Sequence, residues 1–231
     1  MRKLPNPVTY SLEMKFMPWG KLLAGVLLEV IKRVPRNGSV IDLMCGPGFL
    51  LDMIRNHRPD LALTGVDIDY QYIRYASKKN PGIQYKQANV LSNNYHGIFD
   101  CVICTGSMHH LPYETQPLLF DKMSSLISKN GLCICADPCI SEYTNELDRQ
   151  LAAAELGYEY LKAVLHTQAP LSIIDATLNI SHNDVLADGE YKNSLSQMTK
   201  MASQFFGHIE INKIWPNSYS SYGDYYIVCH D

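Results

Sequence analysis

The chain has 231 residues, of which 46% are hydrophobic and 19% charged. It contains 20 Lys and Arg and 23 Asp and Glu, which give a formal net charge of −3. A chain of this length and apolar content can bury a full hydrophobic core, which excludes disorder as its main state. The slightly acidic balance disfavours nucleic acid as a partner, because such binding depends on neutralising phosphates.

The seven cysteines predict reduced core thiols, because most of them lie in apolar runs. Cys101 and Cys104 have a C-x-x-C spacing, but they fall in a predicted buried strand and no second ligand pair follows. We therefore expect no metal site.

The N-terminal segment does not resemble a secretory signal, since Pro5, Asn6 and Pro7 stand where an apolar run is needed. The longest apolar stretch, residues 22–30, is too short to span a bilayer. The sequence predicts a cytoplasmic protein without membrane insertion.

The first 138 residues predict one helix followed by an alternation of strands and helices. Residues 9–35 show helical periodicity, which Pro35 and Gly38 end. The expected strands that follow are 39–45, 61–67, 83–86, 99–104 and 132–136, and the expected helices are 49–58, 70–79 and 114–127, with residues 129–131 capping the last. Strands that alternate with helices at this spacing predict a parallel, doubly wound α/β sheet.

The alternation then stops, and residues 139–206 are predicted to be a helical insertion. One apolar stripe of this insertion consists of Leu147, Leu151, Ala154, Tyr158, Leu161 and Leu165. A helix is expected at 194–206, and the strands expected at 209–215 and 225–230 are too close for a helical crossover, so they should form an antiparallel hairpin. We expect a single domain, 1–231, with an N-terminal helical region (1–37), a core (38–138), the insertion (139–206) and a closing hairpin (207–231).

Residues 40–48 carry the strongest local signal, a glycine-containing turn from the first strand into a helix. Gly46 and Gly48 allow a tight turn and the close approach of a ligand, and the helix beyond offers free N–H groups to an anion. Open α/β sheets bind ligands at this carboxyl edge. Leu51 replaces the third glycine of a dinucleotide-binding loop.

Two acids accompany this turn. Asp42 lies inside an otherwise apolar strand, and its burial requires a partner, either the backbone at the turn or an amino group of a ligand. Asp67 follows at the end of the second strand, where a carboxylate can accept both hydroxyls of a ribose.

Taken together, these motifs resemble those of the class I S-adenosylmethionine-dependent methyltransferases. Residues 42–48 resemble the family's D-x-G-x-G-x-G motif, with Met44 at the first glycine position, and residues 65–69 resemble its second motif. The resemblance implies a seven-stranded, mostly parallel Rossmann-like sheet with an antiparallel last strand. It also implies S-adenosylmethionine as the cofactor, with S-adenosylhomocysteine as the product.

The resemblance assigns a set of cofactor contacts. Asp67 would bind the ribose, Ile68 would lie beside the adenine, and Asn89 stands where the family often has an acid that contacts the adenine amino group. Asp69 is expected instead to cap the following helix. The full set of expected cofactor-binding residues is Asp42, Met44, Cys45, Gly46, Gly48, Asp67, Ile68, Asn89, Val90 and Cys104.

Three residues are candidates for catalysis or for orienting the acceptor. His109 and His110 are candidate general bases, because an unshifted imidazole titrates near neutrality, although either could instead pack or cap the following helix. Asp137 ends the fifth strand at the same edge and could orient an acceptor or cap the turn at Pro138.

The resemblance and the acidic composition favour methyl transfer to a small-molecule acceptor, covered by the insertion. Such transfer is an in-line displacement from an activated donor, to which the protein contributes proximity, alignment and exclusion of water. Two other classes stay open: a non-catalytic or regulatory protein that binds the nucleoside, and an NAD-dependent oxidoreductase. The acceptor and the oligomeric state stay open too.

Overall fold

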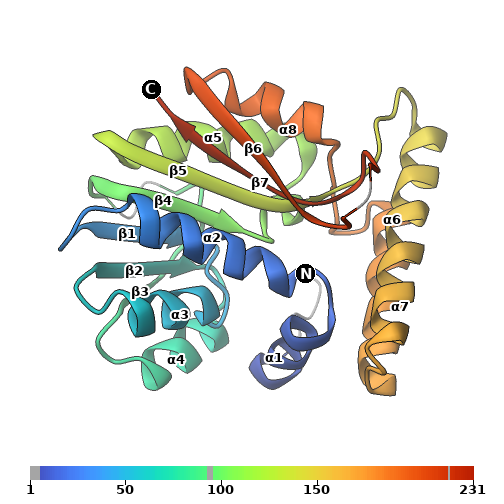
Figure 1. The fold of residues 1–231 in the computed structure, drawn as a ribbon, viewed down its shortest axis with the longest axis horizontal. Helices are drawn as coiled ribbons and strands as arrows, with labels where there is room; N and C mark the ends of the chain where they lie inside the picture. Colours follow the sequence, from blue (N-terminus) through green and yellow to red (C-terminus); the bar gives the residue numbers. More distant parts are fainter. Residues whose placement is uncertain (1–5, 93–95, 218) are drawn as a thin grey trace.

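The computed structural model describes residues 6–92, 96–217 and 219–231. Figure 1 shows a twisted sheet with helices on both faces and a helical pair, α6 and α7, beside it. The strands are β1 (Ser39–Leu43), β2 (Ala62–Asp67), β3 (Gln84–Gln87), β4 (Phe99–Thr105), β5 (Ile127–Cys139), β6 (His208–Trp215) and β7 (Gly223–His230). The secretory-signal reading of the first residues includes residues 1–5, which lie outside the described part.

The sheet has the order β3-β2-β1-β4-β5-β7-β6. The neighbouring pairs from β3 to β5 are parallel, whereas β7 runs antiparallel to both β5 and β6. The predicted fold class and the closing hairpin are therefore confirmed.

The helices are α1 (Pro7–Phe16), α2 (Gly20–Arg33), α3 (Phe49–His57), α4 (Tyr70–Lys79), α5 (Gln116–Leu126), α6 (Glu146–His166), α7 (Leu171–Leu186) and α8 (Leu195–Ala202), with short 3-10 turns at Met108–His110 and Tyr113–Thr115. None of the described helices is long and apolar enough to cross a bilayer.

The single helix expected at 9–35 was wrong, because the chain breaks between α1 and α2. Pro18 lies at the break, where it has no N–H to donate to a preceding turn. Gly20 then allows the two helices to approach closely, since a Cβ at this position would lie 1.9 Å from the carbonyl oxygen of Met14. The result is a helical corner that brings α1 over the carboxyl edge of the sheet.

The fifth strand is longer than expected. It begins at Ile127 and includes residues 129–131, which the sequence had suggested as a helix cap. Phe99 pairs with Ile127 and Cys101 with Leu132, so the extra residues of β5 are taken up in an irregularity between these pairs. At its other end β5 runs on to Cys139, which keeps Asp137 within the strand.

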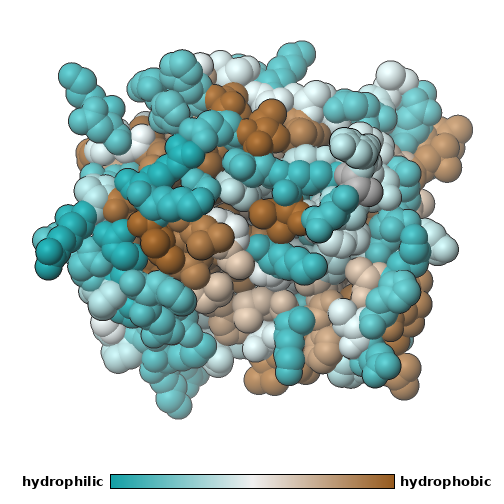
Figure 2. Space-filling view, viewed as in Figure 1, coloured by the Kyte–Doolittle hydropathy of each residue, from teal (hydrophilic) through white to brown (hydrophobic). Residues whose placement is uncertain are grey.

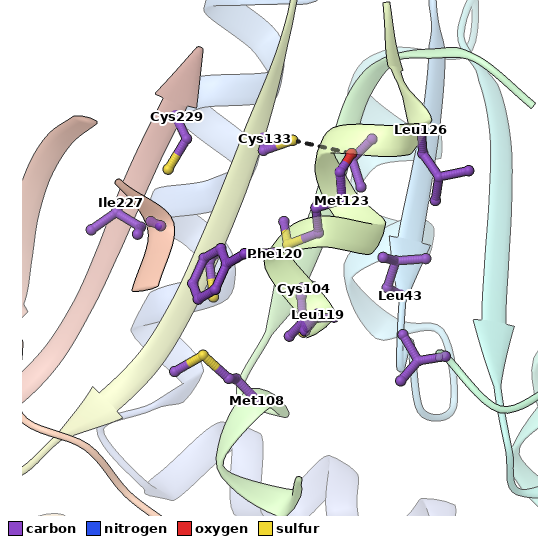
Figure 3. Close-up of a cluster of buried hydrophobic side chains, with 14 of the residues drawn as sticks. Leu43, Cys104, Met108, Leu119, Phe120, Met123, Leu126, Cys133, Ile227 and Cys229 are labelled. Carbon is purple, nitrogen blue, oxygen red and sulfur yellow. Dashed lines mark hydrogen bonds between the residues drawn. The ribbon is translucent and has the colours of Figure 1, made fainter. Parts of the chain in front are cut away.

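Two hydrophobic cores cover the faces of the sheet. Phe120 and Met123 of α5 pack with Cys104 of β4 and with Met108 on one face, as Figure 3 shows. The other face packs against α2 and α3, where Leu51 is fully buried. All seven cysteines are free thiols and six of them are buried, as the apolar runs had predicted.

Most of the apolar stripe of α6 faces solvent, whereas Leu161 is half-buried against an interior cluster. Leu147, Leu151 and Tyr158 are each more than half exposed. The buried face of α6 is formed instead by residues that include Ala152, Ala153, Leu156, Gly157 and Tyr160.

Candidate cofactor and acceptor site

The glycine turn after β1 is held in a conformation that few side chains adopt. Met44, Gly46 and Gly48 have φ values of 58°, 53° and 78°, all in the left-handed region that favours glycine. Gly48 also has no room for a side chain, since a Cβ would lie 2.6 Å from the hydroxyl oxygen of Tyr85. Met44 occupies such a conformation without being glycine, a strain of about 1–3 kcal/mol.

Asp67 ties this turn to the end of β2. Its Oδ2 accepts a hydrogen bond from the backbone N–H of Gly46 at 2.8 Å, and its Oδ1 accepts one from the N–H of Asp69, also at 2.8 Å. Asp69 caps α4 through bonds from the N–H groups of Gln71 and Tyr72, as predicted. An ionised carboxylate can accept about four hydrogen bonds, so Asp67 has capacity left for a ligand hydroxyl.

Asp42 is buried and lacks a partner. Its side chain is 3% exposed, and no hydrogen bond or ion pair reaches its carboxylate from the described residues. Burial raises its pKa well above the usual range, and the neighbouring charge of Asp67 adds to the shift. Of the two partners that the sequence left open for Asp42, the backbone at the turn does not supply one.

A small pocket opens beside Asp42 and the turn. Its lining residues are Tyr10, Trp19, Leu23, Asp42, Met44, Cys45, Phe49, Leu50 and Thr105. The ring of Tyr10 stacks on Phe49 with centroids 5.9 Å apart and lies 5.1 Å from the ring of Trp19. The helical corner between α1 and α2 therefore contributes aromatic walls to the pocket.

The N-terminus of α3 lies at the same pocket. Gly48 precedes the helix and supplies no side-chain cap, and Phe49 and Leu50 of its first turn line the cavity. The first N–H groups of a helix carry a partial positive charge. The pocket thus combines a buried carboxyl group with a positive helix end.

The other expected cofactor residues lie in different surroundings. Ile68 is half exposed and accessible to a flat ring, whereas Val90 is buried in the core. The side-chain oxygen of Asn89 already accepts the backbone N–H of Leu91 at 2.9 Å. The side chain of Cys104 points into the core rather than the pocket.

Thr105 takes the place at the pocket that Cys104 was expected to fill. Adjacent residues of a strand point to opposite faces, so this alternation could have identified Thr105 from the sequence. Its hydroxyl is buried without a hydrogen-bond partner among the described residues, and it lies in the pocket wall. A ligand in the pocket could supply that partner.

His109 is held between two carboxylates at the acceptor edge. Its Nδ1–H donates to Asp137 Oδ1 at 2.8 Å and its backbone N–H donates to Asp137 Oδ2 at 3.1 Å. Its Nε2 lies 3.2 Å from Glu190 Oε2. Burial alone would lower the pKa of His109, but the two carboxylates outweigh it and raise the pKa to about 9. At neutral pH His109 is therefore an imidazolium.

Glu190 continues this network into the helical insertion. It lies 3.1 Å from the ammonium of Lys192, which also pairs with Asp184 of α7. The carbonyl oxygen of His109 accepts the backbone N–H of Tyr191, so the segment is fixed by its backbone as well. The sequence analysis missed these charged residues, because no local motif marks them and their partners are distant in the chain.

His110 has a different character from its neighbour. Its side chain is 37% exposed, and its Nδ1 lies 3.4 Å from the carbonyl oxygen of Gly189. Partial burial and the charge of His109 lower its pKa to about 4, so it is neutral at pH 7. His109, His110 and Glu190 are close enough to surround a metal ion, a grouping that the sequence analysis did not foresee. In the described arrangement, however, Glu190 already binds Lys192 and both ring nitrogens of His109 face carboxylates.

Asp224 is a further acid that the sequence analysis missed. It is the second residue of β7 and pairs with Pro138 of β5. Its side chain is fully buried and accepts a hydrogen bond from the hydroxyl of Tyr160 of α6. Its Oδ2 has no partner among the described residues, and burial raises its pKa to about 7. This contact fixes α6 to the carboxyl edge of the sheet.

Comparison with known proteins finds a family model that matches the first part of this geometry. Residues 40–131 match the family model described as "Methyltransferase domain". The resemblance to class I S-adenosylmethionine-dependent methyltransferases is confirmed. The matched segment contains the glycine turn, Asp67 and the edge at His109, and it ends before the helical insertion.

The curated relatives match about half of the chain. Trans-aconitate 2-methyltransferase of Methylobacterium nodulans is 25% identical over 127 residues, which cover 54% of this chain and 48% of the relative. The enzyme of that name from Escherichia coli O139:H28 is 30% identical over 115 residues, which cover 50% of this chain and 42% of the relative. The chain thus matches about half the length of these relatives.

Solved structures share the fold over most of the chain. A TehB-like SAM-dependent methyltransferase from Corynebacterium glutamicum superposes with a TM-score of 0.57 at 12% identity, covering 89% of this chain and 85% of that one. The structure described as PigF with SAH has a TM-score of 0.60 at 17% identity, covering 92% of this chain and 56% of that one.

The strain at Met44 predicts that a glycine variant at this position is more stable than an alanine variant. We expect Met44→Gly to be more stable than Met44→Ala by about 1 kcal/mol, because both variants lose the same packing beyond Cβ but only glycine relieves the left-handed strain. Urea unfolding of both variants measures the difference. A Met44→Ala variant that is the more stable of the two would contradict the strained turn.

The carboxylates around His109 predict a pH dependence. The pKa of His109 in the folded protein is about 9 and exceeds the ordinary 6.5. The pairing of protonated His109 with the carboxylates therefore stabilises the fold fully below pH 6.5, and this stabilisation is lost as the pH rises through 9. Asp137→Asn should lower the pKa of His109 in an NMR titration and reduce that loss. Asp188→Asn, an exposed acid of the same segment, is the control. A wild-type His109 that titrates near 6.5 would show that the carboxylates do not hold its proton.

Proposed function

We propose that the protein transfers a methyl group from S-adenosylmethionine to a small-molecule acceptor. The observation that carries this proposal is the buried, unpartnered carboxylate of Asp42 in a pocket with aromatic walls and an uncapped helix N-terminus. A buried charge without a partner is costly, so such a pocket favours a ligand that brings a cation.

The methionine part of the cofactor matches these groups. Its ammonium would lie against Asp42, and its carboxylate would face the N-terminal N–H groups of α3. The rings of Tyr10, Trp19 and Phe49 offer cation–π contact to a sulfonium. Asp67 at the end of β2 is then available to the ribose hydroxyls through its remaining acceptor capacity. Each of these matches supports binding of S-adenosylmethionine.

The same charges count against the oxidoreductase alternative. A dinucleotide brings a doubly charged pyrophosphate to the glycine turn, where a carboxylate at Asp42 would repel it. Leu51 at the third glycine position is fully buried in the core, where its side chain fills the space between α3 and β2. The binding-only alternative is favoured by one observation, the strained Met44 in the pocket wall.

The acceptor would lie at the edge formed by the end of β4, His110 and the insertion. Lys192 and Arg149 are buried there, and both are already paired: Lys192 with Asp184 and Glu190, and Arg149 with Glu146 and the last carbonyls of α7. Cations committed in this way do not favour a polyanionic acceptor such as trans-aconitate. We therefore propose an acceptor that is neutral or carries little negative charge.

His110 is the proposed residue for contact with the attacking atom of the acceptor. It is neutral and partly exposed, so it can accept a hydrogen bond or a proton as the nucleophile attacks the methyl carbon and the carbon–sulfur bond breaks. His109 would act differently, as a cation fixed by Asp137 that positions its neighbour. The protein's main contributions would be alignment and exclusion of water.

Calorimetric titration with S-adenosylhomocysteine tests the proposal. We expect micromolar binding by the wild type, and a loss of about 1–3 kcal/mol for Asp67→Ala, because this variant removes charged hydrogen bonds to the ribose and to the turn. Asp121→Ala, which removes an exposed acid from α5, should bind like the wild type. NADH titrated into the same protein should show no binding.

Two results would overturn this reading. NADH binding without S-adenosylhomocysteine binding by the folded wild type would favour the oxidoreductase. Tight S-adenosylhomocysteine binding with no methyl transfer to any member of a panel of neutral hydroxyl, amine and thiol acceptors would favour the binding-only alternative.

A further inference from the structure

The solvent-facing side of α6 carries an apolar seam along its whole length. The seam consists of Leu147, Leu151, Ala154, Tyr158, Leu161 and Leu165, and the exposed fractions of Leu147, Leu151, Tyr158 and Leu165 are 63%, 61%, 62% and 52%. Leu161 is half-buried, because it also packs against the interior cluster that contains Val164 and Ile173. In the view of Figure 2, apolar side chains gather at the right edge of the molecule, where Figure 1 shows α6 and α7. Isolated exposed leucines are common, but a continuous exposed row marks an interaction surface.

The spacing along this seam is that of a coiled coil. Successive members are four, three, four, three and four residues apart, which is the a/d pattern of three heptads. The opposite face of α6 is already occupied, because Ala153, Leu156 and Tyr160 are buried against the rest of the molecule. The seam is therefore a second apolar face whose natural occupant is another helix.

We propose that this occupant is α6 of a second copy of the chain, paired antiparallel across a two-fold axis. In that arrangement Leu147 meets Leu165 of the second copy, and Leu151 meets its Leu161. At the centre Ala154 meets Tyr158 of the second copy, a small residue opposite a large one. Every layer of the seam then has an apolar partner, as a self-complementary interface between identical chains requires.

One pair of charges beside the seam fits the same arrangement, whereas Glu155 would lie beside its own copy at the centre. Asp148 and Lys162 both occupy the position that follows a d residue, and the antiparallel pairing brings Asp148 of one copy beside Lys162 of the other, twice per dimer. In the single chain Lys162 pairs with Glu159 at 2.8 Å and lies over the ring of Tyr158. Its ammonium is thus already at the edge of the seam.

The size of the seam sets the strength expected of the dimer. A helix of 21 residues is about 31 Å long. One such helix face buries on the order of 500 Å² per copy, less than the ~800 Å² of a standard interface. We therefore expect a dimer that dissociates with a Kd of tens of micromolar rather than a permanent one.

Sedimentation velocity of the full chain from about 2 to about 200 μM tests the interface. The wild type should shift from monomer to dimer across this range, and Leu151→Glu should remain monomeric. Leu118→Glu, a matched change at a half-exposed leucine of α5, should dimerise like the wild type. Circular dichroism spectra that match the wild type would show that Leu151→Glu is folded.

A charge reversal tests the antiparallel register. Lys162→Asp should weaken the dimer by about tenfold, and the double variant Asp148→Lys with Lys162→Asp should recover most of the loss. A wild type that stays monomeric at about 200 μM would overturn the proposal, as would a folded Leu151→Glu that still dimerises. Failure of the double variant to recover would overturn the register. None of these outcomes depends on the cofactor.

Discussion

The proposed cofactor site depends on the hydrogen bonds that the carboxylate of Asp67 accepts. It accepts one hydrogen bond from the turn after β1 and one from the turn after β2, so a single side chain sets the distance between two loops that the sheet holds only at their bases. The bond from Gly46 holds this residue where the turn adopts its left-handed conformation. The pocket next to Asp42 has its shape because this contact prevents the turn from opening.

A network of buried charged residues connects the sheet to the helical insertion on the proposed acceptor side. Asp137 of β5 fixes His109, Glu190 joins His109 to Lys192, and Lys192 reaches Asp184 on α7. The order alternates acid and base, so each buried charge has a partner, as burial requires. Asp42 differs, because none of the described residues pairs with its carboxyl group, and this contrast supports the proposed role of Asp42 in binding a ligand. The contact of Tyr160 with Asp224 adds a further link between sheet and cover.

Local signals predicted the cofactor half because that half is built from local structure. The turn at residues 44–48, the cap at Asp69 and the strand-end position of Asp67 follow from residues within a few positions of each other. Pro18 did carry a signal for the break between α1 and α2, but the periodicity on either side outweighed it. The partners of His109 were invisible in sequence, since Glu190 lies about eighty residues further on and only the fold brings them together.

The sequence pattern does not indicate which face of α6 is buried, and the reason is physical. Its buried face uses small residues such as Ala152, Ala153 and Gly157, which add little to a hydrophobic pattern but allow close approach. A Cβ at Gly157 would lie 2.0 Å from Ser181 Oγ of α7. The strongest apolar row of the helix was therefore free to face solvent.

A crystal structure of the chain with S-adenosylhomocysteine would test the central claim most directly. We expect the ribose hydroxyls within hydrogen-bond distance of Asp67, the amino group of the ligand against Asp42, and its carboxylate at the N-terminus of α3. A nucleoside bound away from the glycine turn, or a ligand that leaves the carboxylate of Asp42 without a cation, would contradict it.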